Sequence, residues 1–341
     1  MRDDIDSIRN TILVGDTFKL MGTLPDASVD TVWSSPPYWS VREYPVGVDI
    51  TPYGEEPTIS GYVERTVELF FCMERVLKPW GTVWWNVGDS YATANNQELK
   101  GKNACMIPFR IAMALQSHGW TVRNIVAWVK KSTMPEPHTD RLPTAWEPIL
   151  LLAHPKSEGE YHFDMDRIRL PSVDRVHPAG VPPKDWCTVK RANFKGQEHF
   201  AMQPLGLPGR YLPATLPARV CLECSKPTLH TAWQAQSRTW GEYKQERDRT
   251  WRPEGRSAGN TGLKNRHMDD RVWSKHTTRC GCDAGTSPGV VLDPFMGSGT
   301  TAVAARRLGC DFIGLEAIEQ VAQRARNRVG GEPMDLFTMN Q

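Results

Sequence analysis

The stretch Gly289-Val290-Val291-Leu292-Asp293-Pro294-Phe295-Met296-Gly297-Ser298-Gly299-Thr300-Thr301 decides the fold of this chain. The stretch predicts a buried strand over residues 289–292, a glycine turn, and a helix over residues 300–308. Gly297 and Gly299 allow the backbone to approach a ligand closely. A second strand is predicted at 311–315, and Glu316 at its tip can accept both hydroxyls of a ribose. This arrangement predicts a pocket for a nucleoside cofactor.

Charge helps to select the class of cofactor. Ala302 completes the spacing Gly-x-Gly-x-x-Ala of dinucleotide-binding folds, so spacing alone does not exclude a dinucleotide. The carboxylate of Asp293, beside the glycine turn, would repel a pyrophosphate and would suit a cofactor with a cationic ammonium. An adenosine cofactor without phosphates therefore fits better.

The same alternation of strand and helix precedes the cofactor stretch. Apolar runs and helical spacing predict strands near 12–14, 28–34, 82–87, 121–129 and 148–153, helices at 59–77 and 107–118, and a last helix at 318–329. We therefore expect an α/β fold with a parallel, doubly wound sheet that is interrupted and then resumes at the C-terminus. Residues 155–217 show no sustained period and predict an irregular subdomain, and the polar residues 233–270 predict a long insertion.

Length, charge and cysteine content limit the class of protein. The 341 residues and 40% apolar content predict roughly two domains of about 150 residues, with a sizeable core. No apolar run is long enough for a membrane span, and the first ten residues are acidic and polar, unlike a secretory signal. The cysteines are mostly scattered, which favours thiols or metal ligands over disulfides. We expect a cytoplasmic protein without a membrane partner.

The net charge of +2 hides an asymmetry along the chain. Residues 1–153 hold 14 Lys and Arg against 18 Asp and Glu, whereas residues 154–341 hold 27 against 21. Residues 225–279 alone hold 12 basic and 6 acidic side chains, interleaved with four tryptophans. Basic charge serves phosphates and aromatic rings stack on bases, so this segment is a candidate nucleic-acid surface, although a solvated charge run would look similar.

A second motif, Ser34-Ser35-Pro36-Pro37-Tyr38-Trp39, ends the strand predicted at 28–34. Consecutive prolines fix φ and remove two N–H donors, so the backbone carbonyls stay available to a substrate, while the ring of Tyr38 offers a stacking face. Such a site suits a planar molecule with an exocyclic NH2 group. A rigid strand-to-loop turn is the alternative interpretation.

Together the two motifs resemble those of the DNA amino-methyltransferases, which use S-adenosylmethionine to methylate N6 of adenine or N4 of cytosine. Ser35-Pro36-Pro37-Tyr38 is similar to their catalytic motif, and the stretch from Asp293 to Thr300 is similar to their cofactor motif. The order of the motifs is that of the family's β group. The resemblance covers roughly residues 12–153 and 286–330 and includes Gly15-Asp16 and the segment 86–91.

The resemblance implies roles for individual residues. Glu316 would bind the ribose hydroxyls, and Asp16 the adenine edge; Asp293, Phe295, Gly297 and Gly299 would surround the methionine and ribose, and Asp89 is a further candidate. Asp16 and Asp89 are open to a second interpretation, since an aspartate after a strand is often a turn or helix cap. Ser35 and the Pro36 carbonyl would accept from the target amine, and Tyr38 would stack on a base flipped from double-stranded DNA.

Two cysteine pairs lie between the similar regions. Cys221 and Cys224 with Cys280 and Cys282 could enclose a tetrahedral zinc ion, which would be structural because all four ligands are thiolates; free thiols are the alternative. Zinc would pin both ends of the basic insertion and hold it near DNA. We therefore expect a catalytic half at 1–155, a target-recognition region at 156–220, a zinc-ribbon insertion at 221–283 and a cofactor-binding half at 284–333.

The predicted function is site-specific DNA methylation of an exocyclic amine. Serine in the first motif position favours cytosine N4 over adenine N6, because aspartate is commoner in the adenine enzymes of the family. A non-catalytic DNA-binding partner of a restriction system and a methyltransferase acting on RNA or protein are the alternatives. A homodimer and a cognate restriction endonuclease are possible partners.

Overall fold

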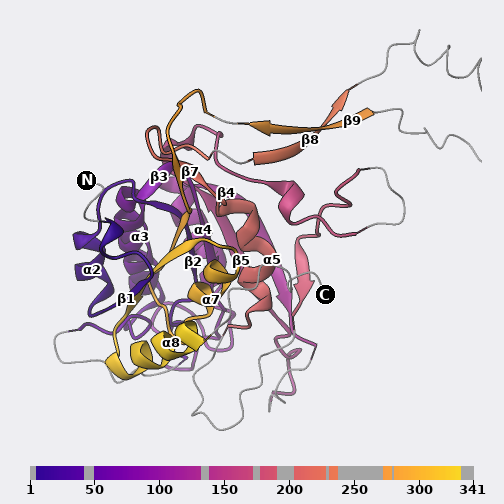
Figure 1. The fold of residues 1–341 in the computed structure, drawn as a ribbon. Helices are drawn as coiled ribbons and strands as arrows, with labels where there is room; N and C mark the ends of the chain where they lie inside the picture. Colours follow the sequence, from indigo (N-terminus) through magenta and orange to yellow (C-terminus); the bar gives the residue numbers. More distant parts are fainter. Residues whose placement is uncertain are drawn as a thin grey trace, which may run out of the picture.

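The computed structural model describes residues 5–41, 50–131, 138–171, 177–189, 203–227, 230–236, 272–278 and 280–331, with the side chains of 230–236 and 272–278 left out. Its centre is an eight-stranded sheet in the order β1-β12-β11-β2-β3-β5-β4-β6 (Figure 1). The strands are β1 (Thr11–Val14), β2 (Val29–Ser34), β3 (Leu77–Asn86), β4 (Thr121–Val129), β5 (Trp146–Ala153), β6 (Trp186–Thr188), β11 (Val290–Asp293) and β12 (Asp311–Glu316). The predicted α/β class is confirmed, and nearly all the predicted strands and helices are found.

One strand runs against the expected parallel direction. The neighbours β1, β12, β11, β2 and β3 are all parallel, but β5 is antiparallel to both β3 and β4. Residues 130–145 connect β4 to β5, and the described part of this connection contains no α-helix of the kind that parallel crossovers use. The expected parallel, doubly wound sheet is therefore found over the five strands from β1 to β3 in the sheet order, and the expectation of a parallel strand is wrong at β5.

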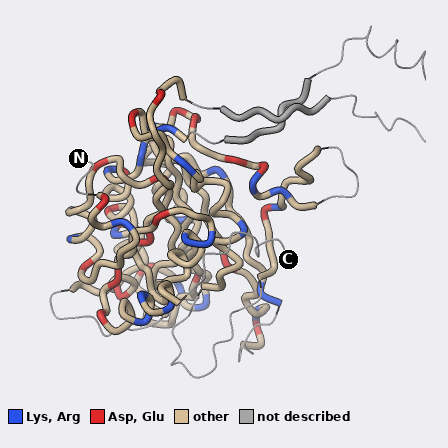
Figure 2. The backbone as a smooth tube through the Cα atoms, in the orientation of Figure 1, with Lys and Arg blue, Asp and Glu red and all other residues tan. Residues whose placement is uncertain are grey.

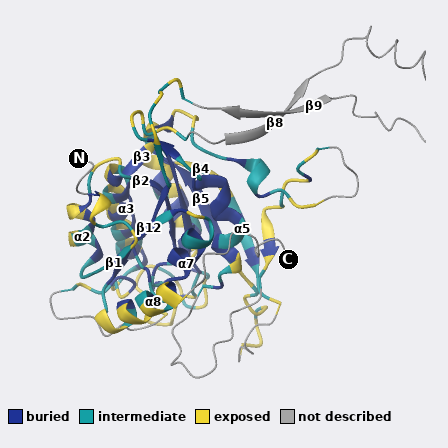
Figure 3. Ribbon diagram, viewed as in Figure 1, coloured by how far each residue is buried: buried dark blue, intermediate teal, exposed yellow. Residues whose placement is uncertain are grey.

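Helices cover both faces of the sheet (Figures 1 and 3). One face packs on α2 (Thr17–Thr23), α3 (Ile59–Val76) and α4 (Ile107–Ser117), and the other on α5 (Gly206–Thr215), α7 (Thr300–Arg307) and α8 (Glu319–Gly331). Alternate side chains of a strand point to opposite faces, so Trp85 lies in the first core and Trp84 in the second. No helix in the described part of the chain is long and apolar enough to cross a bilayer.

Helix α5 lies inside the segment for which we expected irregular structure. Leu207 and Leu212 are fully buried in the second core, and Trp84 Nε1 donates to Thr215 Oγ1 at 2.9 Å. The helix contains two glycines and two prolines, which have low helix propensity, so its periodicity was not recognisable in the sequence. Burial of its apolar face against the sheet overrides this propensity. The predicted region 156–220 thus includes a helix that packs on the central sheet.

Two small antiparallel pairs of strands belong to the cysteine-containing part. β7 (Val220–Cys221) pairs with β10 (Thr286–Ser287), and β8 (His230–Gln236) pairs with β9 (Val272–Thr278). Most of the basic segment 225–279 lies outside the described residues. Over the described backbone, charges of both signs are mixed (Figure 2).

Candidate functional site

The two sequence motifs meet at one edge of the sheet. Parallel strands end at the same edge, and β11 lies between β12 and β2. Asp293 ends β11, Glu316 ends β12, and Ser35 directly follows β2. The chain proceeds from β11 towards β12 on one side and from β2 towards β3 on the other, so the strand order reverses between β11 and β2. Ligands of open α/β sheets bind in the crevice at such a point.

Asp293 links the two motifs directly. Its Oδ1 accepts from Ser34 Oγ at 2.7 Å and from the Phe295 amide at 3.0 Å, and its Oδ2 accepts from Thr301 Oγ1 at 2.6 Å. The side chain is 4% exposed. Burial outweighs these hydrogen bonds and raises the pKa of Asp293 to about 6. The carboxylate therefore fixes the end of β11 against the end of β2 and places a negative charge beneath the glycine turn.

Glu316 supports the glycine turn from the neighbouring strand. Its Oε2 accepts from the Gly297 amide at 2.9 Å and its Oε1 from the Ile318 amide at 3.0 Å. Burial raises the pKa of Glu316, and the two backbone hydrogen bonds oppose this shift. Each carboxylate oxygen has a second acceptor site, so Glu316 can hold the turn and still accept hydroxyl groups.

The two glycines of the turn serve different purposes. Gly297 has a φ of +51° and open space around its Cα, with only the Phe295 carbonyl, 3.9 Å from an added Cβ, in reach. Gly299 has a φ of +81° and begins α7, and a Cβ there would lie 3.2 Å from side-chain atoms of Ala325 and Val329 in α8. The sequence predicts that both glycines let the backbone approach a ligand closely. In the structure the close neighbour of Gly299 is α8, and only Gly297 leaves room for a ligand.

Aromatic side chains pack beneath both the serine-proline motif and the glycine turn. The ring of Phe295 lies 4.8 Å from that of Tyr53 and 6.2 Å from that of Trp85, measured between centroids. Tyr62 of α3 donates its hydroxyl to the Pro37 carbonyl at 2.9 Å. The Pro37 carbonyl is therefore engaged within the protein, contrary to the expectation that both proline carbonyls are available. Among the described residues, no hydrogen bond engages the Pro36 carbonyl.

Tyr38 is held by residues from three other strands or loops. Its hydroxyl donates to Glu147 Oε2 at 2.9 Å and lies 3.4 Å from Ser35 Oγ. A Cβ at Gly88 would lie 2.7 Å from Tyr38 Cε2, so the glycine gives the ring its place. Lys130 forms an ion pair with Glu147 Oε1. Nothing in the sequence pattern marked Glu147 or Lys130 as partners of the motif.

Asp16 and Asp89, for which the sequence allows either a cofactor-binding role or a helix-capping role, cap helices in the structure. Asp16 Oδ1 accepts from the Lys19 amide at 3.0 Å and caps α2. Asp89 accepts from the Met106 and Ile107 amides at 3.0 and 2.9 Å, at the start of α4. The alternative interpretation as caps is therefore what the hydrogen bonds show, and a cofactor role for either residue stays a prediction.

Gln203 joins the segment before α5 to the site, which sequence reasoning missed. Its Oε1 accepts from Trp33 Nε1 at 2.7 Å, and its Nε2 donates to Asn86 Oδ1 at 3.1 Å. Its carbonyl accepts from Thr300 Oγ1 at 3.2 Å. The residue thus connects β2, β3 and α7, and a lone glutamine in a loop carries no sequence signal of such a role.

The four paired cysteines form one cluster at the opposite edge of the sheet. The sulfur atoms of Cys221, Cys224, Cys280 and Cys282 all lie within 4.8 Å of one another. Residues 220–227 fold as a tight knuckle in which the Cys221 amide donates to the Lys226 carbonyl at 2.9 Å. β10, beside the cluster, leads into the start of β11, whose four residues run about 13 Å to Asp293 at the site.

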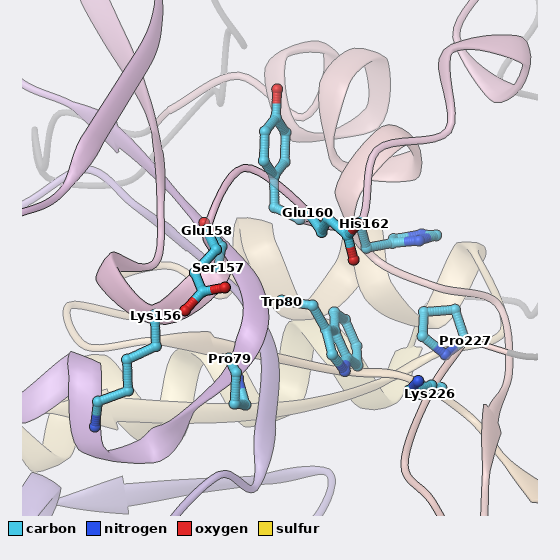
Figure 4. Close-up of a pocket in the computed structure, with 10 residues that line it drawn as sticks. Pro79, Trp80, Lys156, Ser157, Glu158, Glu160, His162, Lys226 and Pro227 are labelled. Atoms are coloured by element: carbon cyan, nitrogen blue, oxygen red, sulfur yellow. The ribbon is translucent and has the colours of Figure 1, made fainter.

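A groove lies next to this knuckle, at the start of β3 and after the end of β5 (Figure 4). Trp80 and His162 line it together with Lys226 and Pro227 of the knuckle, and Lys156, Glu158 and Glu160 contribute charges of both signs. It is separate from the edge that carries Ser35 and Asp293.

Comparison with known proteins gives a consistent result. A family model for N6/N4 methyltransferases, described as DNA methylase, matches residues 29–327. The type II methyltransferase M.SfiI of Streptomyces fimbriatus is 42% identical over 171 residues, which are 47% of this chain and 39% of that protein. M.SmaI of Serratia marcescens is 28% identical over 342 residues, 93% of this chain and 90% of that protein. The chain thus spans well under half of M.SfiI and most of M.SmaI.

Two solved structures share the fold. The PvuII DNA methyltransferase (cytosine-N4-specific) matches with a TM-score of 0.57 and 15% identity, over 97% of this chain and 95% of that one. A putative DNA modification methylase from Thermus thermophilus, complexed with S-adenosyl-L-methionine, matches with a TM-score of 0.53 and 20% identity, over 94% and 93%. The resemblance of fold extends over nearly the whole length of both proteins.

Proposed function

The chain belongs to the N6/N4 DNA methylase family, and from this premise we propose that it methylates N4 of cytosine in double-stranded DNA with Ser35, Pro36, Pro37 and Tyr38 as the base-binding residues. The chain is an S-adenosylmethionine-dependent DNA methyltransferase. The observation that carries the proposal is the hydrogen bond from Ser34 to Asp293, which holds the start of the serine-proline motif against the start of the cofactor motif.

The donor-binding residues fit a nucleoside without phosphates. S-adenosylmethionine supplies an electrophilic methyl group and carries positive charge. We assign the ribose hydroxyls to Glu316, whose carboxylate keeps acceptor sites beside its bond to the Gly297 amide, and the open backbone at Gly297 supports this assignment. Asp293 contributes negative charge to the environment of the donor, and Phe295 contributes its ring to the floor of the site.

The acceptor residues fit an exocyclic amine. Ser35 Oγ and the Pro36 carbonyl can accept the two N–H groups of the amine, which favours a nitrogen whose lone pair is free to attack. The ring of Tyr38, seated on Gly88, stacks on the flipped base. The amine nitrogen bonds to the methyl carbon while the carbon–sulfur bond breaks, S-adenosylhomocysteine leaves, and the surplus amine proton passes to water or to Ser35. No covalent intermediate with the protein is required, so alignment supplies most of the catalysis.

DNA is expected to approach along the edge of the sheet that carries these residues. Trp146, which begins β5 next to Glu147, is 41% exposed, and Leu142 in the preceding loop is 87% exposed. Arg141 stacks on Tyr91, with its guanidinium 3.9 Å from the ring centroid. These side chains offer apolar and cationic groups to a duplex whose base has left the stack.

Cytosine is favoured over adenine because serine occupies the first position of the catalytic motif. Mass spectrometry of nucleosides, after duplex DNA is incubated with the protein and methyl-labelled S-adenosylmethionine, tests the choice. Labelled N4-methylcytosine supports the proposal. Labelled N6-methyladenine refutes the choice of base and leaves the reaction class intact.

The type II names of the relatives support a cognate restriction endonuclease as a partner that recognises the same sequence.

The cysteine cluster fits a structural zinc ion. Four sulfur atoms within 4.8 Å of one another, in two short loops, are close to the distances of a tetrahedral site with four cysteine ligands. Elemental analysis of protein purified without chelator should give about one zinc per chain, and the Cys224→Ser variant should lose the metal and unfold at a lower temperature. Far less than one zinc in the wild-type protein would refute the assignment.

A further inference from the structure

A half-buried ion pair lies behind Tyr38. Glu147 lies on β5 and Lys130 follows β4, and their side chains are only 15% and 13% exposed. Lys130 contacts Glu147 Oε1, which leaves Oε2 directed at the Tyr38 hydroxyl, 2.9 Å away. The Lys130 ammonium also lies 5.1 Å from the centroid of the Trp128 ring. The carboxylate therefore has a fixed orientation.

The chemistry of the three groups fixes the direction of their hydrogen bonds. An ionised carboxylate only accepts hydrogen bonds, and a phenol has a single hydrogen. Tyr38 must therefore donate to Glu147, and any hydrogen bond across the 3.4 Å between Ser35 and Tyr38 must be donated by Ser35. In this arrangement the lone pairs of Ser35 Oγ remain available to the amine of the target base. If Tyr38 donated to Ser35 instead, one of these lone pairs would be occupied.

We propose that Glu147, oriented by Lys130, is a positioning residue that sets the direction of the Ser35 hydroxyl through Tyr38. This inference rests on the proposed role of Ser35 as acceptor of the target amine. The distance of 3.4 Å between the two hydroxyls is long for a hydrogen bond, and we expect it to shorten when the base is bound, as is common for catalytic contacts.

The Glu147→Gln variant should reverse the direction of these hydrogen bonds. The glutamine amide has one accepting and one donating end, and Lys130 can only donate. The amide oxygen will therefore face Lys130, and its NH2 group will face Tyr38. Tyr38 then accepts from the amide and turns its own hydrogen to Ser35. The single-turnover rate should fall at least tenfold, while the affinities for S-adenosylmethionine and DNA remain within about twofold.

The double variant Glu147→Gln with Lys130→Met separates this mechanism from loss of a structural ion pair. Without the lysine, the amide can turn its oxygen back to Tyr38. Relative to Lys130→Met alone, the double variant should lose less than threefold in rate. A purely structural ion pair also recovers when both partners are replaced, because no unpaired cation is then left. It predicts instead that the rate follows the unfolding temperature across the three variants, and that result would overturn the inference. Thermal unfolding of each variant verifies that the fold is kept.

Two further variants distinguish the inference from the function on which it rests. In a Tyr38→Phe background, Glu147→Gln should cause no further loss of rate, because the connecting hydroxyl is absent. If Ser35→Ala methylates DNA at the wild-type rate, the proposed role of Ser35 fails. If Ser35→Ala is inactive while Glu147→Gln is as fast as the wild type, the role of Ser35 stands and only the positioning role of Glu147 is refuted.

Discussion

Replacing Asp293 by asparagine should stabilise the protein at neutral pH and impair the binding of its methyl donor. Burial raises the pKa of Asp293 to about 6, from 3.8 for a solvated aspartate. Between these values the folded protein holds a proton that the unfolded chain has lost, so stability falls as pH rises. A difference of about 2 pH units corresponds to about 3 kcal/mol at pH 7.5 relative to acid pH.

Asparagine reproduces the shape of the protonated aspartate. Its oxygen can accept from Ser34 Oγ and the Phe295 amide, and its NH2 group can donate to Thr301 Oγ1, since a hydroxyl also accepts. The hydroxyl hydrogen of Thr301, which donated to the carboxylate, then turns to a backbone carbonyl of the preceding turn, at a cost smaller than that of the buried charge. The free energy of unfolding in urea should therefore rise by about 2–3 kcal/mol at pH 7.5, and the gain should diminish towards zero near pH 4.

A control variant at a second buried aspartate should change the free energy of unfolding in the opposite direction. Asp30 is equally buried, but it pairs with Lys78 Nζ at 2.6 Å, so Asp30→Asn leaves a buried cation unpaired and should destabilise the protein by roughly 3 kcal/mol. For Asp293→Asn, the affinity for S-adenosylmethionine in calorimetry should fall at least tenfold. The reasoning is refuted if Asp293→Asn is less stable than the wild type at pH 7.5, or if the difference does not vary with pH.

Two more variants test the site. Glu316→Ala should reduce S-adenosylmethionine affinity at least a hundredfold in calorimetry and lower stability by about 2 kcal/mol, because the Gly297 amide loses its acceptor; unchanged affinity contradicts the ribose assignment. Gly88→Ala should displace the ring of Tyr38 and reduce the rate of methyl transfer at least tenfold with S-adenosylmethionine affinity retained, whereas Gly22→Ala, with open space around its Cα, should be fully active. Equal activity of the two glycine variants would show that the position of the ring is unimportant.

The fold was predictable wherever the pattern of burial is periodic. The strand over 28–34 and the helices over 59–77 and 107–118 were placed within a residue or two of β2, α3 and α4, since each buries a continuous apolar face. Helix α5 was missed because its glycines and prolines hide the period, and it exists through tertiary packing. The antiparallel direction of β5 depends on the path of a loop, and no local pattern specifies that path.

The sequence motifs predicted the main residues of the site but not the residues that hold them in place. Asp293, Glu316 and Ser35 were recognisable because they sit at strand ends beside glycine or proline. Glu147 and Gln203 act through contacts across more than 100 residues of sequence, and these contacts appear only when the sheet is assembled. The sequence also could not place the cysteine cluster at the edge opposite the catalytic motif, because that depends on where β10 joins β11.

Under the proposed function, Tyr38 holds the target base, while Asp293, Glu316 and Gly297 of the neighbouring motif bind the methyl donor. The most direct test measures donor binding and DNA methylation for the Tyr38→Ala variant. We predict that calorimetry gives an S-adenosylmethionine affinity within about twofold of the wild type, while transfer of labelled methyl to duplex DNA falls at least a hundredfold. Transfer at the wild-type rate would contradict the account, since the base would then be held elsewhere.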